Sequence, residues 1–141
     1  MRRIVADIES DGLLLDATKI HCLSYYCLDS GESGSITVGN EIKRFLEEEV
    51  DVIIWHNGIL YDRPMLEKIL GVTKVIPMID TLALSWYLYP ERNTHGLESW
   101  GESFGIKKPP ISNWKDLPIE TYVYRCEEDV KINTKLWKQQ Y

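Results

Sequence analysis

The apolar run VIIW, residues 52–55, most restricts how this chain of 141 residues can fold. A strand with four apolar residues in a row has no polar face, so both of its faces must be buried. Such strands are typical of parallel sheets that helices cover on both sides. The flanking segments agree, because 40–50 has apolar residues at helical spacing and 61–70 carries its proline in the first turn of a helix. The run therefore predicts an α/β fold.

The remaining segments predict the order of the elements. Strands are expected at 2–10, 19–29, 35–39, 52–55 and 74–80, with a tight turn at 30–34. Helices are expected at 40–50 with Asn40 as N-cap, and at 61–70, 81–90, 95–105 and 119–141, with an irregular loop at 107–118. The first three strands are expected to form an antiparallel meander. We therefore expect one domain over residues 1–141, with a mixed central sheet flanked by helices.

Composition argues against several classes of protein. No apolar run approaches the ~20 residues that span a bilayer, and the N-terminus lacks the apolar segment of a signal peptide, so no membrane and a cytoplasmic location are expected. The three cysteines form no CxxC pair, which favours reduced thiols over a zinc site or a disulfide framework. A net charge of −6 argues against broad binding of duplex nucleic acid but allows a site that recruits metal cations.

Two acids, Asp7 and Glu9, interrupt the apolar pattern of the first expected strand. Residues two apart on a strand point to the same face, so these carboxylates lie side by side and repel each other. One interpretation is an edge strand with a solvated polar face. The other is a metal site, because Mg²⁺ and similar hard ions take carboxylate oxygens, and such a pair can serve two ions about 4 Å apart.

Asp62 offers a third carboxylate, in the first turn of the helix that follows the VIIW run. The helix dipole favours a negative charge there, so Asp62 either stabilises the helix end or belongs to a site. His56, Asn57 and Gly58 crowd the same strand-to-helix junction, which is where α/β proteins usually place ligands. The amide of Asn57 can bond a phosphate or a base edge. These neighbours favour the second interpretation without excluding the first.

Asp129 ends a run of three acids in the last expected helix. It lies beside an apolar stripe and can reach inward, whereas Glu127 and Glu128 are expected to face solvent. Asp129 is therefore either part of a solvated helix face or a residue of a site. Asp80 is most simply the N-cap of the next helix. His95 is expected to be a hydrogen-bonded structural histidine or a residue near the substrate.

These acids stand in motifs that resemble those of the DEDD 3′–5′ exonucleases, the DnaQ-like branch of the RNase H-like fold. The stretch DIES resembles the first motif, D-x-E, and HNGILYD resembles the second, with four residues between Asn57 and Asp62 in the pattern N-x₄-D. The stretch RCEEDV resembles the third motif and ends in Asp129 and Val130. DTLALSWYLYP and HGLESWG look like the exonuclease domain of phage family A replicative DNA polymerases. The similarity runs along nearly the whole chain.

The resemblance implies a centre that binds two divalent ions, Mg²⁺ or Mn²⁺. The four metal-binding carboxylates it implies are Asp7, Glu9, Asp62 and Asp129. By analogy Asp7 bridges both ions, Glu9 and Asp129 hold the ion on the side of the nucleophile, and Asp62 acts mainly through the second ion. In that case cations neutralise the repulsion between the two acids of the first strand.

One residue departs from the family pattern. The branches of the family place a tyrosine four residues, or a histidine five residues, before the last aspartate. Here Arg125 stands four before Asp129, and Tyr124 stands five before. On a continuous helix, residues five apart point about 140° away from each other. Tyr124 is therefore expected to reach the ions and orient the attacking water only if the backbone before Asp129 is not a regular helix, and the level of activity stays open.

The function expected from this resemblance is a metal-dependent 3′–5′ exonuclease that acts on the 3′ ends of single-stranded DNA. His56, Leu60 and Tyr61, with the loop near His95, are expected to frame the terminal bases. The chain is expected to be a monomer, either free-standing or a proofreading module beside a DNA polymerase, in the host cytoplasm if a phage encodes it. Three alternatives stay open: an inactive nucleic-acid-binding or polymerase-binding module, an RNA-directed exonuclease, and an acidic protein-interaction domain without metal.

Overall fold

A five-stranded sheet in the order β3-β2-β1-β4-β5 forms the centre of the computed structural model, which describes residues 1–106 and 117–141. The strands are β1 (Arg3–Ser10), β2 (Ile20–Cys27), β3 (Ser33–Ile36), β4 (Val52–Trp55) and β5 (Met78–Asp80). β2 pairs antiparallel with both β1 and β3, whereas β4 pairs parallel with both β1 and β5. The predicted mixed sheet, the meander and the buried strand at 52–55 are therefore confirmed.

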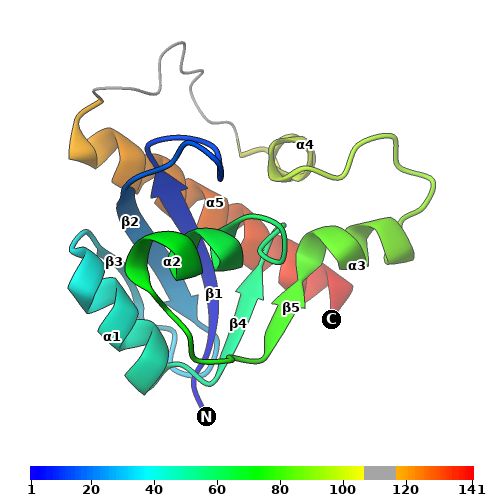
Figure 1. Cartoon of the computed structure of the whole chain (residues 1–141). Helices are drawn as coiled ribbons and strands as arrows, with labels where there is room; N and C mark the ends of the chain where they lie inside the picture. Colours follow the sequence, from blue (N-terminus) through cyan, green and yellow to red (C-terminus); the bar gives the residue numbers. More distant parts are fainter. Residues whose placement is uncertain (107–116) are drawn as a thin grey trace.

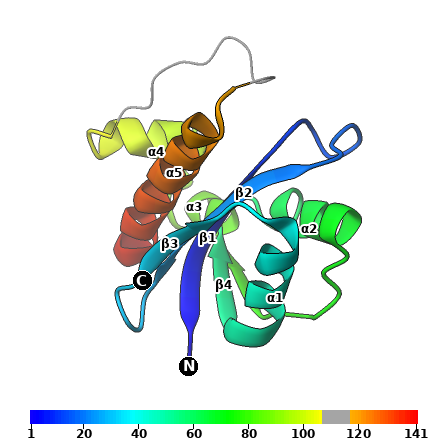
Figure 2. The same cartoon turned by 90° about the vertical axis from the view of Figure 1, so that its left-hand side faces the viewer.

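Helices cover both faces of this sheet (Figures 1 and 2). On one face lie α1 (Gly39–Glu49) and α2 (Asp62–Leu70), and on the other lies the long helix α5 (Ile119–Gln140). The short helices α3 (Thr81–Leu88) and α4 (Leu97–Ser103) lie beside α5. None of the described helices combines the length and apolar character that crossing a membrane requires.

The alternation of side chains along β1 divides the core between the two faces. Ile4, Ala6 and Ile8 belong to the largest apolar cluster, which they share with residues of α1 and α2. Val5 points to the opposite face and packs with Val130 of α5. Because side chains alternate along a strand, the residues two and four positions beyond Val5 also face α5.

Several expected boundaries were wrong. α3 ends at Leu88 and α4 spans Leu97–Ser103, so both helices are shorter than expected. β3 begins at Ser33, inside the stretch expected to be a turn, because the chain already reverses in a tighter loop in which Gly31, with a φ of 78°, donates to the carbonyl of Cys27. α1 begins at Gly39 after an extended Val38, so Asn40 is not its N-cap.

The strand expected at 74–80 is limited to Met78–Asp80, since Pro77 has no N–H to donate to a ladder. Most of the loop expected at 107–118 lies outside the described residues. All three cysteines are free and buried.

Candidate metal centre

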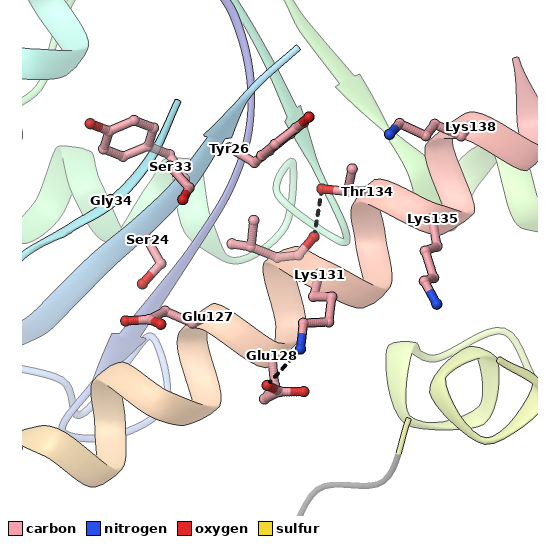
Figure 3. Close-up of a pocket in the computed structure, with 12 residues that line it drawn as sticks. Ser24, Tyr26, Ser33, Gly34, Glu127, Glu128, Lys131, Thr134, Lys135 and Lys138 are labelled. Carbon is pink, nitrogen blue, oxygen red and sulfur yellow. Dashed lines mark hydrogen bonds and ion pairs between the residues drawn. The ribbon is translucent and has the colours of Figure 1, made fainter. Parts of the chain in front are cut away.

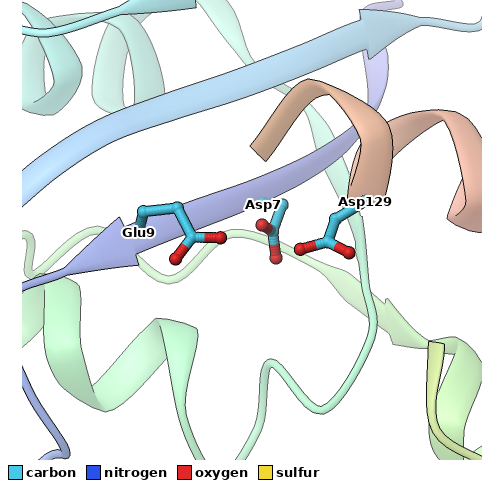
Figure 4. A group of neighbouring side chains, drawn as sticks. All are labelled: Asp7, Glu9 and Asp129. Carbon is cyan, nitrogen blue, oxygen red and sulfur yellow. The ribbon is translucent and has the colours of Figure 1, made fainter. Parts of the chain in front are cut away.

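The side chains of Asp7 and Glu9 project from β1 toward α5, which carries Asp129 (Figure 4). Each of the three residues offers one carboxylate oxygen, and these oxygens all lie within 4.8 Å of one another. In Figure 4, Asp7 lies between the other two. The structure thus brings two neighbouring acids of the first strand together with one that is more than a hundred residues away in the sequence.

Contacts on both sides of Asp129 fix the register of α5 over the sheet. The apolar side chain of Val130, the next residue, packs against Val5 and Ile54. One helical turn earlier, the thiol of Cys126 donates to the backbone carbonyl of Asp7, with the sulfur 3.0 Å from the oxygen. These contacts leave Asp129, 9% exposed, directed toward the acids of β1.

Asp7 is a carboxylate whose surroundings call for a compensating charge. Burial raises the pKa of the Asp7 carboxyl well above its ordinary value. Three neighbouring carboxylates raise this pKa further, and they are Asp129, Asp62 and Glu9. The Oδ2 atom of Asp7 is buried and has no hydrogen-bond partner among the described residues. A cation in contact with this oxygen would remove the cost of burying the charge.

Asp62 lies at the start of α2 and is 3% exposed. Burial raises the pKa of its carboxyl well above the ordinary value, against the opposing effect of a backbone hydrogen bond at Ile8. The charges of Glu9 and Asp129 raise it further, so Asp62 is within electrostatic reach of the cluster. It is not one of the three residues whose oxygens lie within 4.8 Å of one another.

The donor set fits a hard divalent cation. All of the clustered ligand atoms are carboxylate oxygens, which Mg²⁺ and Mn²⁺ prefer, and neither imidazole nor thiolate belongs to the cluster as described. A buried carboxylate oxygen without a partner, beside two further carboxylates, is the local feature that such an ion would satisfy.

His56 and Asn57, at the end of β4, are engaged with the neighbouring strand end. The Nδ1 atom of His56 lies 2.9 Å from the Thr81 hydroxyl oxygen, and burial lowers the pKa of His56 to about 4. Asn57 has a φ of 66°, and its backbone N–H donates to Asp80 at 2.8 Å. Asp80 also accepts from the backbone N–H of Leu82, so the expectation that it is an N-cap is confirmed.

The other expected substrate contacts divide into exposed and internal side chains. Leu60 is 72% exposed, and the hydroxyl of Tyr61 is hydrogen-bonded with Ser10 at 2.7 Å. His95 is 3% exposed, and its Nδ1 atom lies 2.6 Å from the Ser85 hydroxyl oxygen. The structural interpretation of His95 therefore matches its surroundings, whereas Leu60 is accessible to a ligand.

The structure does not bring Tyr124 to the cluster. α5 is an unbroken helix from Ile119 to Gln140, so the irregular backbone that Tyr124 would need before Asp129 is absent. Tyr124 is 50% exposed and points about 140° away from Asp129 around the helix.

Sequence reasoning missed two polar contacts that join α5 to the sheet. One is the Cys126 thiol on the Asp7 carbonyl. The other is Asn133, 2% exposed, whose Oδ1 accepts from the Thr81 hydroxyl at 2.5 Å. Their spacing could have identified these two residues. Both lie one helical turn from Asp129 and therefore on the side of α5 that faces the sheet.

Comparisons with known proteins relate the chain to phage DNA polymerases. No family model matches the chain. The chain is 31% identical to the DNA-directed DNA polymerase of Enterobacteria phage T3 and 30% identical to that of Escherichia phage T7, and each match covers 74% of the chain. It spans only 19% of the length of these polymerases.

Solved structures of nucleases share the fold. A structure described as the apo form of the nuclease superposes with a TM-score of 0.73 at 20% identity and covers 98% of this chain and 70% of its own. Brucella melitensis NrnC with bound Mg²⁺ superposes with a TM-score of 0.67 at 17% identity and covers 96% of this chain and 72% of its own. The expected fold is thereby confirmed. The matches to the two phage polymerases support the expected family resemblance.

Proposed function

We propose that this chain, a member of the DnaQ-like exonuclease family with the RNase H-like fold, is a metal-dependent 3′–5′ exonuclease that acts on single-stranded DNA. The observation that carries the proposal is the convergence of Asp7, Glu9 and Asp129 from two distant parts of the chain. On a solvated acidic surface, both oxygens of Asp7 would be exposed to water, but here one of them is buried without a hydrogen-bond partner among the described residues.

Each carboxylate has a role in this proposal. Asp7, between the other two acids, would help to hold two cations, and Glu9 and Asp129 would hold the one that activates water. Asp62, buried beside the cluster, would act mainly on the second ion. When bound, divalent cations supply Lewis-acid chemistry, which activates water for attack on a phosphodiester and stabilises the leaving oxygen. The protein contributes four fixed negative charges and a scaffold that holds them in place.

The substrate proposal rests on the polymerase relatives and on the side chains around the cluster. Both relatives are named DNA polymerases, which favours DNA, and a proofreading module beside a polymerase is the corresponding cellular role. The exposed Leu60 would contact a terminal base, and the half-buried Tyr61 would frame it. His56 and His95 would act indirectly, because their Nδ1 atoms are bonded to neighbouring hydroxyls.

The test is cleavage of labelled single-stranded DNA with Mg²⁺ or Mn²⁺, with and without chelator. We expect stepwise shortening from the 3′ end that stops with chelator and in Asp7→Ala. Glu48→Ala, which removes an exposed acid of α1, is the matched control and should leave the rate unchanged. Shortening that persists in Asp7→Ala would show that the site is elsewhere.

Two further arms separate the alternatives. A matched RNA strand that is shortened faster than DNA would favour an RNA-directed enzyme. No shortening with either ion, together with retained binding of the strand, would indicate an inactive binding module.

A further inference from the structure

A groove lies between α5 and the strands β2 and β3 (Figure 3). It encloses about 620 Å³. Ser24, Tyr26 and Ser33 line it from the sheet, and Lys131, Lys135 and Lys138 line it from the helix. These lysines lie about 120–180° around α5 from Asp129, so they do not face the acidic cluster.

The groove is a basic site on an acidic protein. The chain has a net charge of −6, yet three lysines follow one another along a single stripe of α5. Of these three lysines, only Lys131 has an ion-pair partner among the described residues, which is Glu128 at 3.2 Å. Lys138 lies over the ring of Tyr26, with its nitrogen 5.6 Å from the ring centroid. Lys135 and Lys138 are therefore available to an external anion.

Two acids close one end of the same groove. Glu127 accepts a hydrogen bond from the Ser35 hydroxyl at 3.1 Å, which ties α5 to β3. Glu128 lies beside it and pairs with Lys131 (Figure 3). A nucleic-acid strand carries a negative charge at every nucleotide and would be repelled at this end. A peptide can place acidic residues at the lysines and neutral or basic residues at the glutamates.

The sheet also ends here. β3 is an edge strand, so one side of its backbone has no partner strand in the described sheet. Gly34, in the middle of β3, also lines the groove. Unpaired N–H and C=O groups of an edge strand bind an extended peptide by adding it as a further strand.

We propose that this groove docks an extended acidic segment of a partner protein, which pairs with the edge of β3 and places its carboxylates on Lys135 and Lys138. Such a site would join the nuclease to another protein without occupying the metal centre, because Lys135 and Lys138 lie about 120–180° around α5 from Asp129. The proposal does not depend on the nuclease activity.

The test is fluorescence anisotropy with a labelled synthetic peptide in which Glu alternates with Val over one half and Thr alternates with Val over the other, so that neutral residues can meet Glu127 and Glu128. We expect the Lys135→Glu/Lys138→Glu variant to weaken binding at least about tenfold, since each pairing becomes a repulsion. Lys43→Glu, which changes a lysine of α1, is the matched control and should bind as wild type does. N-methylation of alternate peptide amides should weaken binding by a similar factor, because it blocks strand pairing.

Three results would overturn the proposal. The first is that the wild-type chain does not bind the peptide, and the second is that Lys135→Glu/Lys138→Glu binds it as well as the control Lys43→Glu does. The third is that the chain binds a labelled oligothymidylate but not the peptide, and loses the oligothymidylate in the double variant. Cleavage of single-stranded DNA measured in parallel should be the same in the double variant and in wild type. A failed peptide experiment with normal cleavage would therefore reject the docking site and leave the proposed function intact.

Discussion

The two faces of β1 differ in what their side chains contribute. On one face Ile4, Ala6 and Ile8 are at most 3% exposed and belong to the main apolar core. On the other face the apolar pattern continues only at Val5 and then gives way to Asp7 and Glu9. The same eight-residue strand thus contributes to stability through one face and carries acids that cost stability on the other.

The difference shows how a small fold accommodates a charged site. Burying apolar surface contributes roughly 25 cal/mol per Å², which the first face provides. Burying a carboxylate without a partner is unfavourable, as the raised pKa of Asp7 shows. The contacts of α5 at Val130 and Cys126 hold the acids together despite their repulsion.

The largest expected effect is on the acidic face. We expect Asp7→Asn to reduce cleavage at least about a thousandfold, because it removes the central ligand of the proposed centre. A carboxyl whose pKa is raised on folding stabilises the protein below its ordinary pKa of 3.8, and this stability is lost as the pH rises through the folded value. At pH 7 without metal, Asp7→Asn should therefore unfold at equal or higher urea concentration than wild type. Lower stability with unchanged cleavage would reverse the comparison.

The apolar face predicts the opposite outcome. Ile4 is fully buried, so Ile4→Ala should lower the free energy of unfolding by about 2–4 kcal/mol. The cleavage rate per folded molecule should stay within about twofold of wild type, because the acids lie on the other face. Urea unfolding and cleavage measured on the same sample check both parts. A large loss of cleavage in fully folded protein would show that the faces are coupled.

His56 gives a smaller, pH-dependent effect. Its pKa of about 4 in the folded protein is below its ordinary value of 6.5, so the neutral form is favoured by folding. The stability it contributes is complete above pH 6.5 and is lost as the pH falls toward 4, by up to about 3 kcal/mol. Unfolding of wild type and His56→Gln across this range measures the difference. Parallel curves for the two proteins would show that His56 does not titrate in this way.

The smallest expected effect is at Tyr124. Its side chain is half exposed and points away from the acids, so Tyr124→Phe and Tyr124→His should both cleave within about twofold of wild type. Single-turnover cleavage rates measure this. A loss of tenfold or more in both variants would place the tyrosine in the reaction and would require α5 to change before Asp129.

Local patterns predicted much of this molecule. The apolar run gave the strand at 52–55 to the residue, and the two-residue spacing placed Asp7 and Glu9 on one face. The edge strands were less predictable from apolar residues. The bounds of β3 depend on its pairing with β2, and β5 begins directly after Pro77.

Contacts between distant segments could not be derived from the sequence. The groove between α5 and the strands β2 and β3 is lined by Ser33 and Gly34 and by lysines of α5 about a hundred positions later. In the sequence, each of these lysines resembles any solvent-exposed helix residue. The partnership of Cys126 with the Asp7 carbonyl likewise depends on the register of α5 over the sheet. The residues around Asp129 in the sequence left two interpretations of this acid. The resemblance to exonucleases assigned it to the candidate site.

Calorimetric titration with Mn²⁺ at neutral pH tests most directly whether Asp7, Glu9 and Asp129 form a cation site. We expect wild type and Glu48→Ala to bind the ion with the same stoichiometry, and Asp7→Asn to lose most of the binding heat. Equal heats in wild type and Asp7→Asn, or no heat in wild type, would contradict the account.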